Sequence, residues 1–372
     1  MKINYLAMSD IPSKNANALH IVQMCNAFID NGLKVKLFLP SFFHTIDKSV
    51  KQYYGTKHKI NIIRVGKNRK FLNKVDNIFV PLQIVLKNLK TKPDLILTRN
   101  LVMSFFLILL NKKHILELHD DIKISGKFLS FLFKKLKLLN SKNIIRLIFI
   151  TKGLKEFISK NYFYNKKNYR ILSDSSSISF KFKKLNIEKK RLNIGYFGSI
   201  YKSRGINLIL KLSKIDQNND YYIYGGTNSE IMKLKLRTNN KNIFLFKQIP
   251  YSKIPKHLEK MDVLLMPYTD KVSSTGDVGN IVNFMSPMKM FDYLKASRIV
   301  ISSDIPVLRF LLKNNVNAKI VKNYKNVFAW KNLIYKNSKD NVKNIIISNN
   351  AKKTVENFTW ENRAKVMLDG IL

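Results

Sequence analysis

The sequence contains a single cysteine, Cys25, in 372 residues. One thiol excludes an internal disulfide, and so little cysteine is typical of proteins from reducing compartments. The longest apolar run, residues 101–110, has about half the length that crosses a bilayer. The N-terminal apolar stretch is too short for the core of a signal peptide. We therefore expect a cytoplasmic protein without a transmembrane segment.

Acidic residues are scarce as well, with 24 Asp and Glu against 67 Lys and Arg and a formal net charge of +43. Such an excess favours an anionic partner, either nucleic acid or an anionic lipid surface. Zinc-finger, RNP and basic-zipper signatures are absent, so we expect no nucleic-acid partner. Two interpretations stay open. The charge serves a peripheral contact with the cytoplasmic face of a membrane, or it reflects a coding bias toward Lys, Asn and Ile.

Other properties are those of a globular chain. The hydrophobic fraction is 45% and the aromatic fraction 11%, and the length allows two domains. A serine-rich stretch at residues 173–179 and a basic run at 181–191 form the clearest break. We predict a first domain over 1–185, a second over 190–355, and a final segment, 356–372, that contains the last helix.

Short apolar runs alternate with helical patterns in both halves, which predicts an α/β protein with a parallel sheet in each half. The expected strands are residues 2–7, 35–39, 60–65, 95–98, 114–118, 147–150, 192–198, 221–226, 243–246, 262–267 and 299–302. Two Rossmann-like domains are the simplest arrangement of these elements. The G-x-G-x-x-G fingerprint of dinucleotide-binding proteins is absent, and we expect no cofactor.

The segment 127–139 is both basic and apolar, with helical spacing. Such a helix can lie on an anionic bilayer. It can equally cover a buried sheet while its lysines extend to solvent. Because a parallel sheet needs helices over both faces, we favour the second interpretation slightly.

Residues 283–303 predict a loop, a capped helix and a buried strand. Ser286 suits the N-cap, and Pro287 suits the first helical position, where no N–H is needed. The positive end of the helix and the charge of Lys289 make a phosphate site. Asp292, three residues further on the same face, is placed to meet a ribose. The alternative is a capped surface helix with a solvated Lys–Asp pair.

Two further loops carry candidate residues. Gly198 allows close backbone approach after an apolar strand, and Arg204 offers a planar fork for phosphate oxygens. His119 and Asp120 directly follow the strand 115–118, at the sheet edge where ligands bind in open α/β proteins. A single histidine is more often structural, but its place on this loop favours a function.

Taken together, these segments resemble the retaining glycosyltransferases of family 4, among the group 1 glycosyl transferases. The GT-B fold of that family has two Rossmann-like domains that face each other across a cleft. The resemblance covers almost the whole chain. It is carried by residues 11–20, 27–28, 31–35, 118–120, 195–199, 204–205, 248–258, 262–268, 286–293 and 358–363.

The resemblance implies that the second domain binds a nucleotide-diphosphate sugar and that the first binds the acceptor, a glycan or a lipid-linked glycan. The last helix would cross back to the first domain. By similarity, the catalytic residues are His119, Arg204 and Lys289. The donor-binding residues are Asn15, Ala16, Gly198, Ser199, Lys247, Ile249, Ser286, Pro287, Met288 and Asp292. Of these, the segment from Lys247 to Ile249 would hold the base.

Two departures from the family pattern matter. The family often has two glutamates eight positions apart, and these positions are Phe284 and Asp292 in this sequence. The first carboxylate is therefore missing. The family also often has an arginine after the glycine at 198, where this chain has Ser199. We expect Lys289 to supply the lost charge.

The resemblance also implies transfer with retention of the anomeric configuration. Fixed cations and helix amides can stabilise the negative charge of the leaving diphosphate without a metal, and no Asp-x-Asp triplet is present to bind one. We expect no metal site. Two other functions stay open: a GT-B sugar epimerase or phosphorylase, and a non-catalytic basic lipid-binding protein.

Overall fold

The computed structural model describes residues 1–42, 49–69, 73, 75–186, 188–273, 280–338 and 340–371. The chain forms two compact units. The first consists of Met1–Asp174, Phe284–Ser286 and Trp360–Leu372, and the second of Ser175–Asn283 and Pro287–Thr359. The passage from Asp174 to Ser175 lies inside the serine-rich stretch, whereas the sequence analysis placed the division at 185–190.

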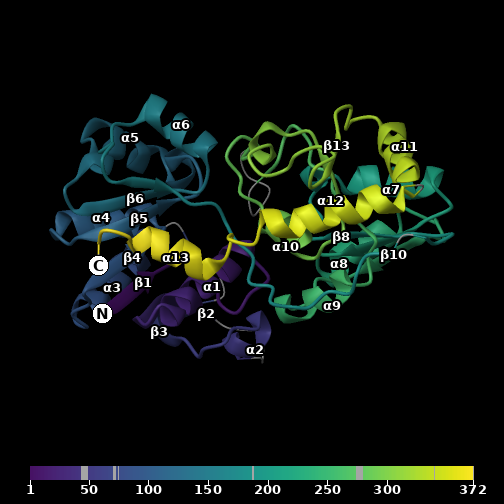
Figure 1. Ribbon diagram of the computed structural model, residues 1–372. Coiled ribbons are helices and arrows are strands. Elements are labelled where there is room, and N and C mark those ends of the chain that lie inside the picture. The colour runs from purple at the N-terminus through teal and green to yellow at the C-terminus, as the bar shows by residue number, and fades with distance from the viewer. Residues whose placement is uncertain are drawn as a thin grey trace. The chain divides into compact units, whose positions relative to one another are not determined.

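The first unit contains a seven-stranded sheet in the order β3-β2-β1-β4-β5-β6-β7, in which all neighbours are parallel (Figure 1). Its strands are β1 (Lys2–Leu6), β2 (Lys34–Phe42), β3 (Asn61–Arg69), β4 (Leu95–Thr98), β5 (His114–Leu118), β6 (Ile144–Phe149) and β7 (Tyr169–Ile171). Its helices are α1 (Ala16–Asp30), α2 (Val50–Tyr54), α3 (Asp76–Leu89), α4 (Leu101–Leu109), η1 (Ile122–Ser125), α5 (Lys127–Lys135), η2 (Leu138–Asn140), α6 (Lys152–Asn161) and α13 (Trp360–Leu368).

The second unit contains a six-stranded parallel sheet in the order β10-β9-β8-β11-β12-β13. Its strands are β8 (Asn193–Phe197), β9 (Asp220–Tyr224), β10 (Ile243–Phe246), β11 (Val263–Met266), β12 (Ile299–Ser303) and β13 (Lys319–Val321). Its helices are η3 (Lys202–Arg204), α7 (Ile206–Ile215), α8 (Asn228–Lys235), η4 (Tyr251–Lys253), α9 (Ile254–Leu258), α10 (Met288–Lys295), η5 (Pro306–Leu308), α11 (Val327–Ser338) and α12 (Asn341–Thr354).

Both sheets follow the Rossmann strand order 3-2-1-4-5-6, with β7 added at the edge of the first. The predicted α/β class with two Rossmann-like parallel sheets is therefore confirmed. The central strands were found because parallel strands covered on both faces are almost continuously apolar, and all four residues of β4 and of β11 are buried. The three-residue edge strands β7 and β13 were missed, because so short a segment shows no pattern.

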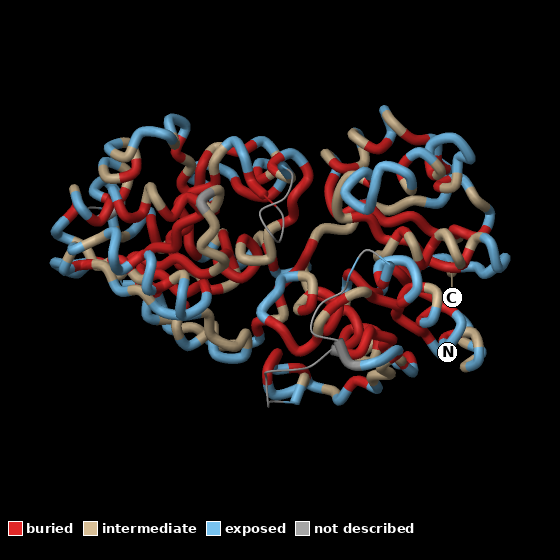
Figure 2. Tube along the Cα trace, turned by 180° about the vertical axis from the view of Figure 1, so that it is seen from behind, coloured by how far each residue is buried: buried red, intermediate tan, exposed pale blue. Residues whose placement is uncertain are grey.

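Buried residues are concentrated in the strands and in the inner sides of the helices (Figure 2). In the second unit the core is closed by Trp330 of α11, which is fully buried against the sheet. In the first unit a charged residue, Glu117, lies next to the last position of β5 and is itself fully buried. None of the described helices is long and apolar enough to cross a membrane.

We favoured the interpretation that the segment 127–139 covers a buried sheet. This interpretation is wrong for part of the apolar face of the segment. Phe133 is fully buried, as expected of a helix that covers a sheet, but Phe128 and Phe131 are 74% and 54% exposed. The segment also divides into α5 and η2, with Lys137 in the left-handed region at φ 49° between them. The chain therefore turns after α5.

Candidate active-site residues in the two units

In the second unit, the candidate residues lie on loops at one edge of the sheet. All six strands are parallel, so the loops that follow β8, β9, β10 and β11 leave from the same, carboxyl edge. Gly198 and Ser199 directly follow β8, and Lys247 and Ile249 follow β10. These four predicted donor-binding residues thus share the edge at which α/β sheets bind ligands.

Lys289 lies in the first turn of α10 and is partly buried. Its Nζ is 4.0 Å from the ring centroid of Tyr196 and 5.4 Å from that of Tyr268. Among the described residues, no hydrogen-bond acceptor or carboxylate contacts this ammonium group. Burial and the nearby charge of Arg204 lower the pKa of Lys289 well below its usual value. The site therefore holds a lysine whose charged form has no counter-ion among the described residues and is disfavoured until an anion binds.

Arg204 approaches the same aromatic ring. Its guanidinium carbon is 5.7 Å from the ring centroid of Tyr268, and its Nη2 donates to the carbonyl of Ser273 at 2.9 Å. Its Nε is buried and has no hydrogen-bond partner among the described residues. The structure thus brings the two predicted cations, Arg204 and Lys289, together around Tyr268. Two neighbouring cations without an acidic partner form a site for an anion.

Gly198 makes room for the lysine. Its backbone has φ +141°, which side-chain-bearing residues rarely adopt, and a Cβ atom there would lie 2.8 Å from Lys289 Nζ. A residue with a side chain at this position would displace the ammonium group. The glycine that the sequence analysis chose for close backbone approach therefore fixes where the cation of α10 lies.

The predicted start of this helix is wrong. Helix α10 begins at Met288, with Pro287 as its N-cap at φ −77° and ψ 113°, and no side chain caps it. The Ser286 hydroxyl is not available, because it accepts the backbone N–H of Asp174 at 2.9 Å in the first unit. The first backbone amides of α10 consequently lack a side-chain cap, which leaves the positive end of the helix open beside Lys289.

Asp292 is buried on the inner side of α10. Its Oδ1 accepts hydrogen bonds from Ser176 Oγ at 2.6 Å and from Tyr251 Oη at 2.8 Å. Burial and the neighbouring carboxylate raise the pKa of Tyr251 well above its usual value, so the phenol remains a donor. In this structure Asp292 thus connects three segments of the second unit, and its expected contact with a ribose stays a prediction.

Phe284, the position of the missing glutamate, belongs to the first unit. Its ring centroid is 5.4 Å from that of Phe157 on α6, and its carbonyl accepts the hydroxyl of Thr151 at 3.0 Å. The side chain is 9% exposed. The residue therefore packs as an apolar anchor of the segment 284–286.

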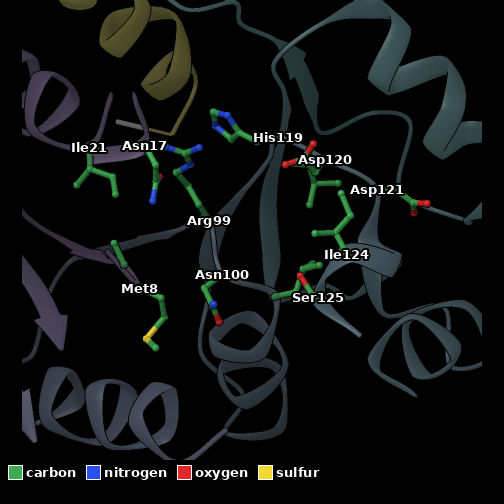
Figure 3. Close-up of a pocket in the computed structure, with 13 residues that line it drawn as sticks. Met8, Asn17, Ile21, Arg99, Asn100, His119, Asp120, Asp121, Ile124 and Ser125 are labelled. Carbon is green, nitrogen blue, oxygen red and sulfur yellow. The ribbon is translucent and has the colours of Figure 1, made fainter. Parts of the chain in front are cut away.

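The first unit has a cavity of about 190 Å³ at the carboxyl edge of its own sheet. Figure 3 shows the side chains that surround it. They come from the loops after β1, β4 and β5 and from α1 and η1: Ala7, Met8, Asn17, Ile21, Arg99, Asn100, Leu101, Leu118, His119, Asp120, Asp121, Ile124 and Ser125. The predicted His119 is among them. Asn15 and Ala16 are exposed at the start of α1, and Asn17 lines the cavity instead.

Two polar groups in this cavity lack partners within the described part of the chain. Arg99 Nη1 and Asp120 Oδ1 are both buried and make no hydrogen bond. Burial raises the pKa of Asp120 to about 6, and the charge of Asp121 adds to this, although Arg99 acts in the opposite direction. Unpaired buried polar groups are costly, so both are placed for a polar ligand. The sequence analysis named Asp120 only in passing and did not find Arg99.

His119 is fixed by Glu117. Its Nε2 lies 2.7 Å from Glu117 Oε1, on a side chain that is 18% exposed. Burial and the charge of Arg99 lower the pKa of His119 to about 3, despite the carboxylate beside it. The ring is therefore neutral near pH 7 and donates its Nε2 proton to Glu117. Its Nδ1 is left as a hydrogen-bond acceptor.

Glu117 is the centre of a buried polar cluster that the sequence analysis missed. Its Oε1 also accepts from Arg363 Nη2 of α13 at 2.7 Å, and His20 Nε2 lies 3.1 Å from the same atom. His20 Nδ1 is bonded to Asp174 Oδ1 at 2.7 Å. Burial disfavours ionisation of Glu117, but Arg363, His20 and His119 hold its pKa well below the usual value. The sequence did contain a signal for this cluster, because Glu117 is an acidic residue inside the otherwise apolar run 115–118.

Three residues of this cluster, His20, Glu117 and His119, form a donor set that could bind a metal ion, with ligand atoms within 4.8 Å of one another. The guanidinium of Arg363 already bonds the carboxylate, however. A divalent cation would be placed next to a full positive charge. We therefore interpret the cluster as an ion-pair network that positions His119.

Comparisons with solved structures define the fold class. Sucrose-phosphate synthase from Thermosynechococcus elongatus has a TM-score of 0.75 at 13% identity, over 99% of this chain and 97% of the synthase. HepE from Anabaena, solved with UDP-glucose, has a TM-score of 0.71 at 13% identity, over 100% and 99%. A variant of TarM from S. aureus has a TM-score of 0.72 at 13% identity, over 99% of both chains. The predicted GT-B fold is confirmed.

The sequence of the second unit is similar to one protein family. Residues 177–354 match the family model described as Glycosyl transferases group 1. This segment contains Gly198, Arg204, Lys289 and Asp292. The expected resemblance to the group 1 glycosyltransferases is confirmed, and the narrower family 4 stays a prediction. No curated protein matches the chain.

The buried pair Glu117–Arg363 can be tested through stability. We expect Arg363→Met to lower the free energy of unfolding by about 3–5 kcal/mol, because Glu117 is then left as an unpaired buried charge. Urea denaturation followed by circular dichroism measures the effect. Lys365→Met, an exposed position on the same helix, serves as the control and should change stability by less than about 0.5 kcal/mol. A loss of under about 1 kcal/mol for Arg363→Met would contradict the pairing.

Proposed function

We propose that the chain is a glycosyltransferase that moves a sugar from a nucleotide-diphosphate sugar to a glycan or lipid-linked acceptor, with retention and without a metal. The observation that carries the proposal is the pair Arg204 and Lys289. Both cations lie around Tyr268, beside an open helix N-terminus, and have no acidic partner among the described residues. A diphosphate supplies the missing negative charge.

Two independent facts support this choice of ligand. The cation pair lies within the segment that matches the group 1 glycosyltransferase model. HepE, which shares the fold, is described in complex with UDP-glucose, and the TarM variant in complex with UDP. We infer that Gly198, Ser199, Lys247, Ile249 and the start of α10 surround the nucleotide diphosphate in this chain as well.

The chemistry needs little more than fixed positive charge. When the bond between the anomeric carbon and the phosphate oxygen breaks, negative charge builds on the leaving diphosphate. Arg204, Lys289 and the first amides of α10 stabilise that charge. The acceptor hydroxyl forms the new bond on the same face of the sugar, and its proton passes to a leaving phosphate oxygen. No charge change on His119 is required, in keeping with its neutral ring.

The cavity of the first unit is our proposed acceptor site. It combines a hydrogen-bond acceptor at His119 with an unpaired guanidinium nitrogen at Arg99 and an unpaired carboxylate oxygen at Asp120. Hydroxyl groups can donate to a carboxylate and accept from a guanidinium, so this set suits a polyhydroxylated acceptor.

The donor site is tested by substitution of its lysine. We expect Lys289→Ala to lower kcat by about 10²–10³-fold, because a cation that stabilises the leaving group is lost.

Thermal-shift assays should identify which of UDP-glucose, UDP-N-acetylglucosamine, GDP-mannose and ADP-glucose stabilises the wild type. Arg204→Ala should remove that shift.

Lys295→Ala is the matched control, because it removes a lysine from the last turn of the same helix. It should retain the wild-type rate. Release of nucleotide diphosphate that needs an acceptor supports a transferase. Release without any acceptor would point to the alternative of an epimerase or phosphorylase, and no shift with any donor would favour the non-catalytic alternative.

The acceptor site predicts a pH dependence. Asp120 accepts a hydrogen bond from an acceptor hydroxyl more strongly as a carboxylate than as a carboxylic acid. We therefore expect kcat/KM for the acceptor to rise as pH increases through about 6, the pKa of this group. Asp120→Asn should lower kcat/KM and abolish the inflection, while KM for the donor stays unchanged. An inflection that persists in Asp120→Asn would assign it to another group.

Retention without a covalent intermediate is tested by mass spectrometry. No nucleophilic carboxylate is needed when the leaving phosphate takes the proton, so we expect the intact mass of the enzyme to stay unchanged during turnover. The anomeric configuration of the product is read by NMR. A glycosyl adduct on the protein would overturn this mechanism.

A further inference from the structure

An exposed apolar surface in the first unit lies outside both candidate sites. Its centre is α5, where Phe128 and Phe131 are 74% and 54% exposed. Leu136, directly after this helix, and Phe163, two residues after the end of α6, are each 58% exposed. Single exposed apolar residues are normal in proteins, but clusters of them mark interaction sites. These four large apolar side chains therefore indicate an interaction site.

The segments that carry these side chains are held together. Ser130 on the inner side of α5 and Tyr162, the neighbour of Phe163, share a hydrogen bond of 2.7 Å. Lys137 Nζ lies 5.5 Å from the ring centroid of Phe163. Phe133, three residues from Ser130, is fully buried and anchors the helix. The exposed side of α5 and Phe163 therefore form one surface.

The charge around this surface has one sign. Between Ile122 and Lys155 the sequence has nine basic residues and no acidic one. Lys127, Lys134, Lys135 and Lys137 are all exposed, and none forms an ion pair with a described residue. Lys135 Nζ lies 5.5 Å from the ring centroid of Phe131. Aromatic rings are thus interleaved with lysines whose charge is not neutralised.

We propose that this α5 surface, formed by Phe128, Phe131, Leu136, Phe163, Lys127, Lys134, Lys135 and Lys137, docks on an anionic lipid bilayer. Rings of this kind enter the boundary between headgroups and acyl chains, while the lysines extend to the lipid phosphates. A bilayer supplies negative charge over the whole surface, whereas a protein partner would need acidic groups matched to each lysine. The proposal does not depend on the proposed function, although a lipid-linked acceptor would be presented at this surface.

Vesicle co-sedimentation tests the docking. We expect the wild type to bind phosphatidylglycerol–phosphatidylcholine vesicles, and to bind pure phosphatidylcholine at least about tenfold more weakly. Phe128→Ser/Phe131→Ser and Lys134→Glu/Lys135→Glu should each lower the partition coefficient about tenfold or more. These side chains are exposed, so the thermal midpoint should stay at the wild-type value.

Matched controls come from the second unit. Phe328→Ser on α11 removes a phenylalanine that is 58% exposed, and Lys233→Glu/Lys235→Glu reverses two exposed lysines of α8. Both variants should bind vesicles as the wild type does. Equal loss in the controls and in the α5 variants would show a nonspecific effect of net charge and overturn the proposal. Absence of vesicle binding by the wild type would also overturn it and leave an acidic protein as partner.

Insertion is tested separately. Trp330 and Trp360 are buried, so a tryptophan introduced as Phe131→Trp is the accessible reporter. Its emission should shift to shorter wavelength with anionic vesicles and be quenched by brominated lipid. A spectrum that does not change on vesicle binding would contradict insertion of α5.

Discussion

The first unit depends on one ionised carboxylate inside an apolar strand. Removing a charge from water costs several kcal/mol, so Glu117 can ionise within β5 only if the fold brings a cation to it. Arg363, 246 residues away, supplies that charge and also donates to the carbonyls of Leu172 and Ser173. The same carboxylate sets the orientation of His119. The Glu117 carboxylate, together with Arg363, therefore links α13, the segment at Leu172 and Ser173, and the cavity beside His119.

In the second unit, by contrast, two basic side chains lack an acidic partner in the part of the chain that the structure describes. Arg204 and Lys289 have no carboxylate near them among the described residues, and burial and their mutual repulsion disfavour the charged form of Lys289 in the free protein. The Glu117 cluster of the first unit pairs its buried charges with residues of the same unit, which is the property of a structural network. The second leaves two unbalanced, which is the property of a binding site, because a ligand can remove the cost. The glycine backbone at Gly198 keeps this place open.

The basic residues that give the chain its large positive charge have several different roles. Composition alone cannot distinguish these roles. Some guanidinium groups serve as backbone anchors: Arg298 donates to four carbonyls, and Arg146 donates to the carbonyls of Met367 and Asp369. Others, such as Lys289, lie in a candidate site, and the lysines of α5 surround exposed aromatic rings. The sum of +43 therefore combines structural, ligand-binding and surface roles.

The sequence by itself determined the two parallel sheets, the family resemblance and the loops that carry Gly198, His119 and Lys289. Residues that are close in the sequence predict these properties, through their periodicity, their turn chemistry and the spacing of motifs. Tertiary structure alone decided that the Ser286 hydroxyl bonds the backbone of Asp174 and cannot cap α10. It also decided which buried charges are neutralised. The physical reason is that an electrostatic partner can be hundreds of residues away, where no local pattern records the contact.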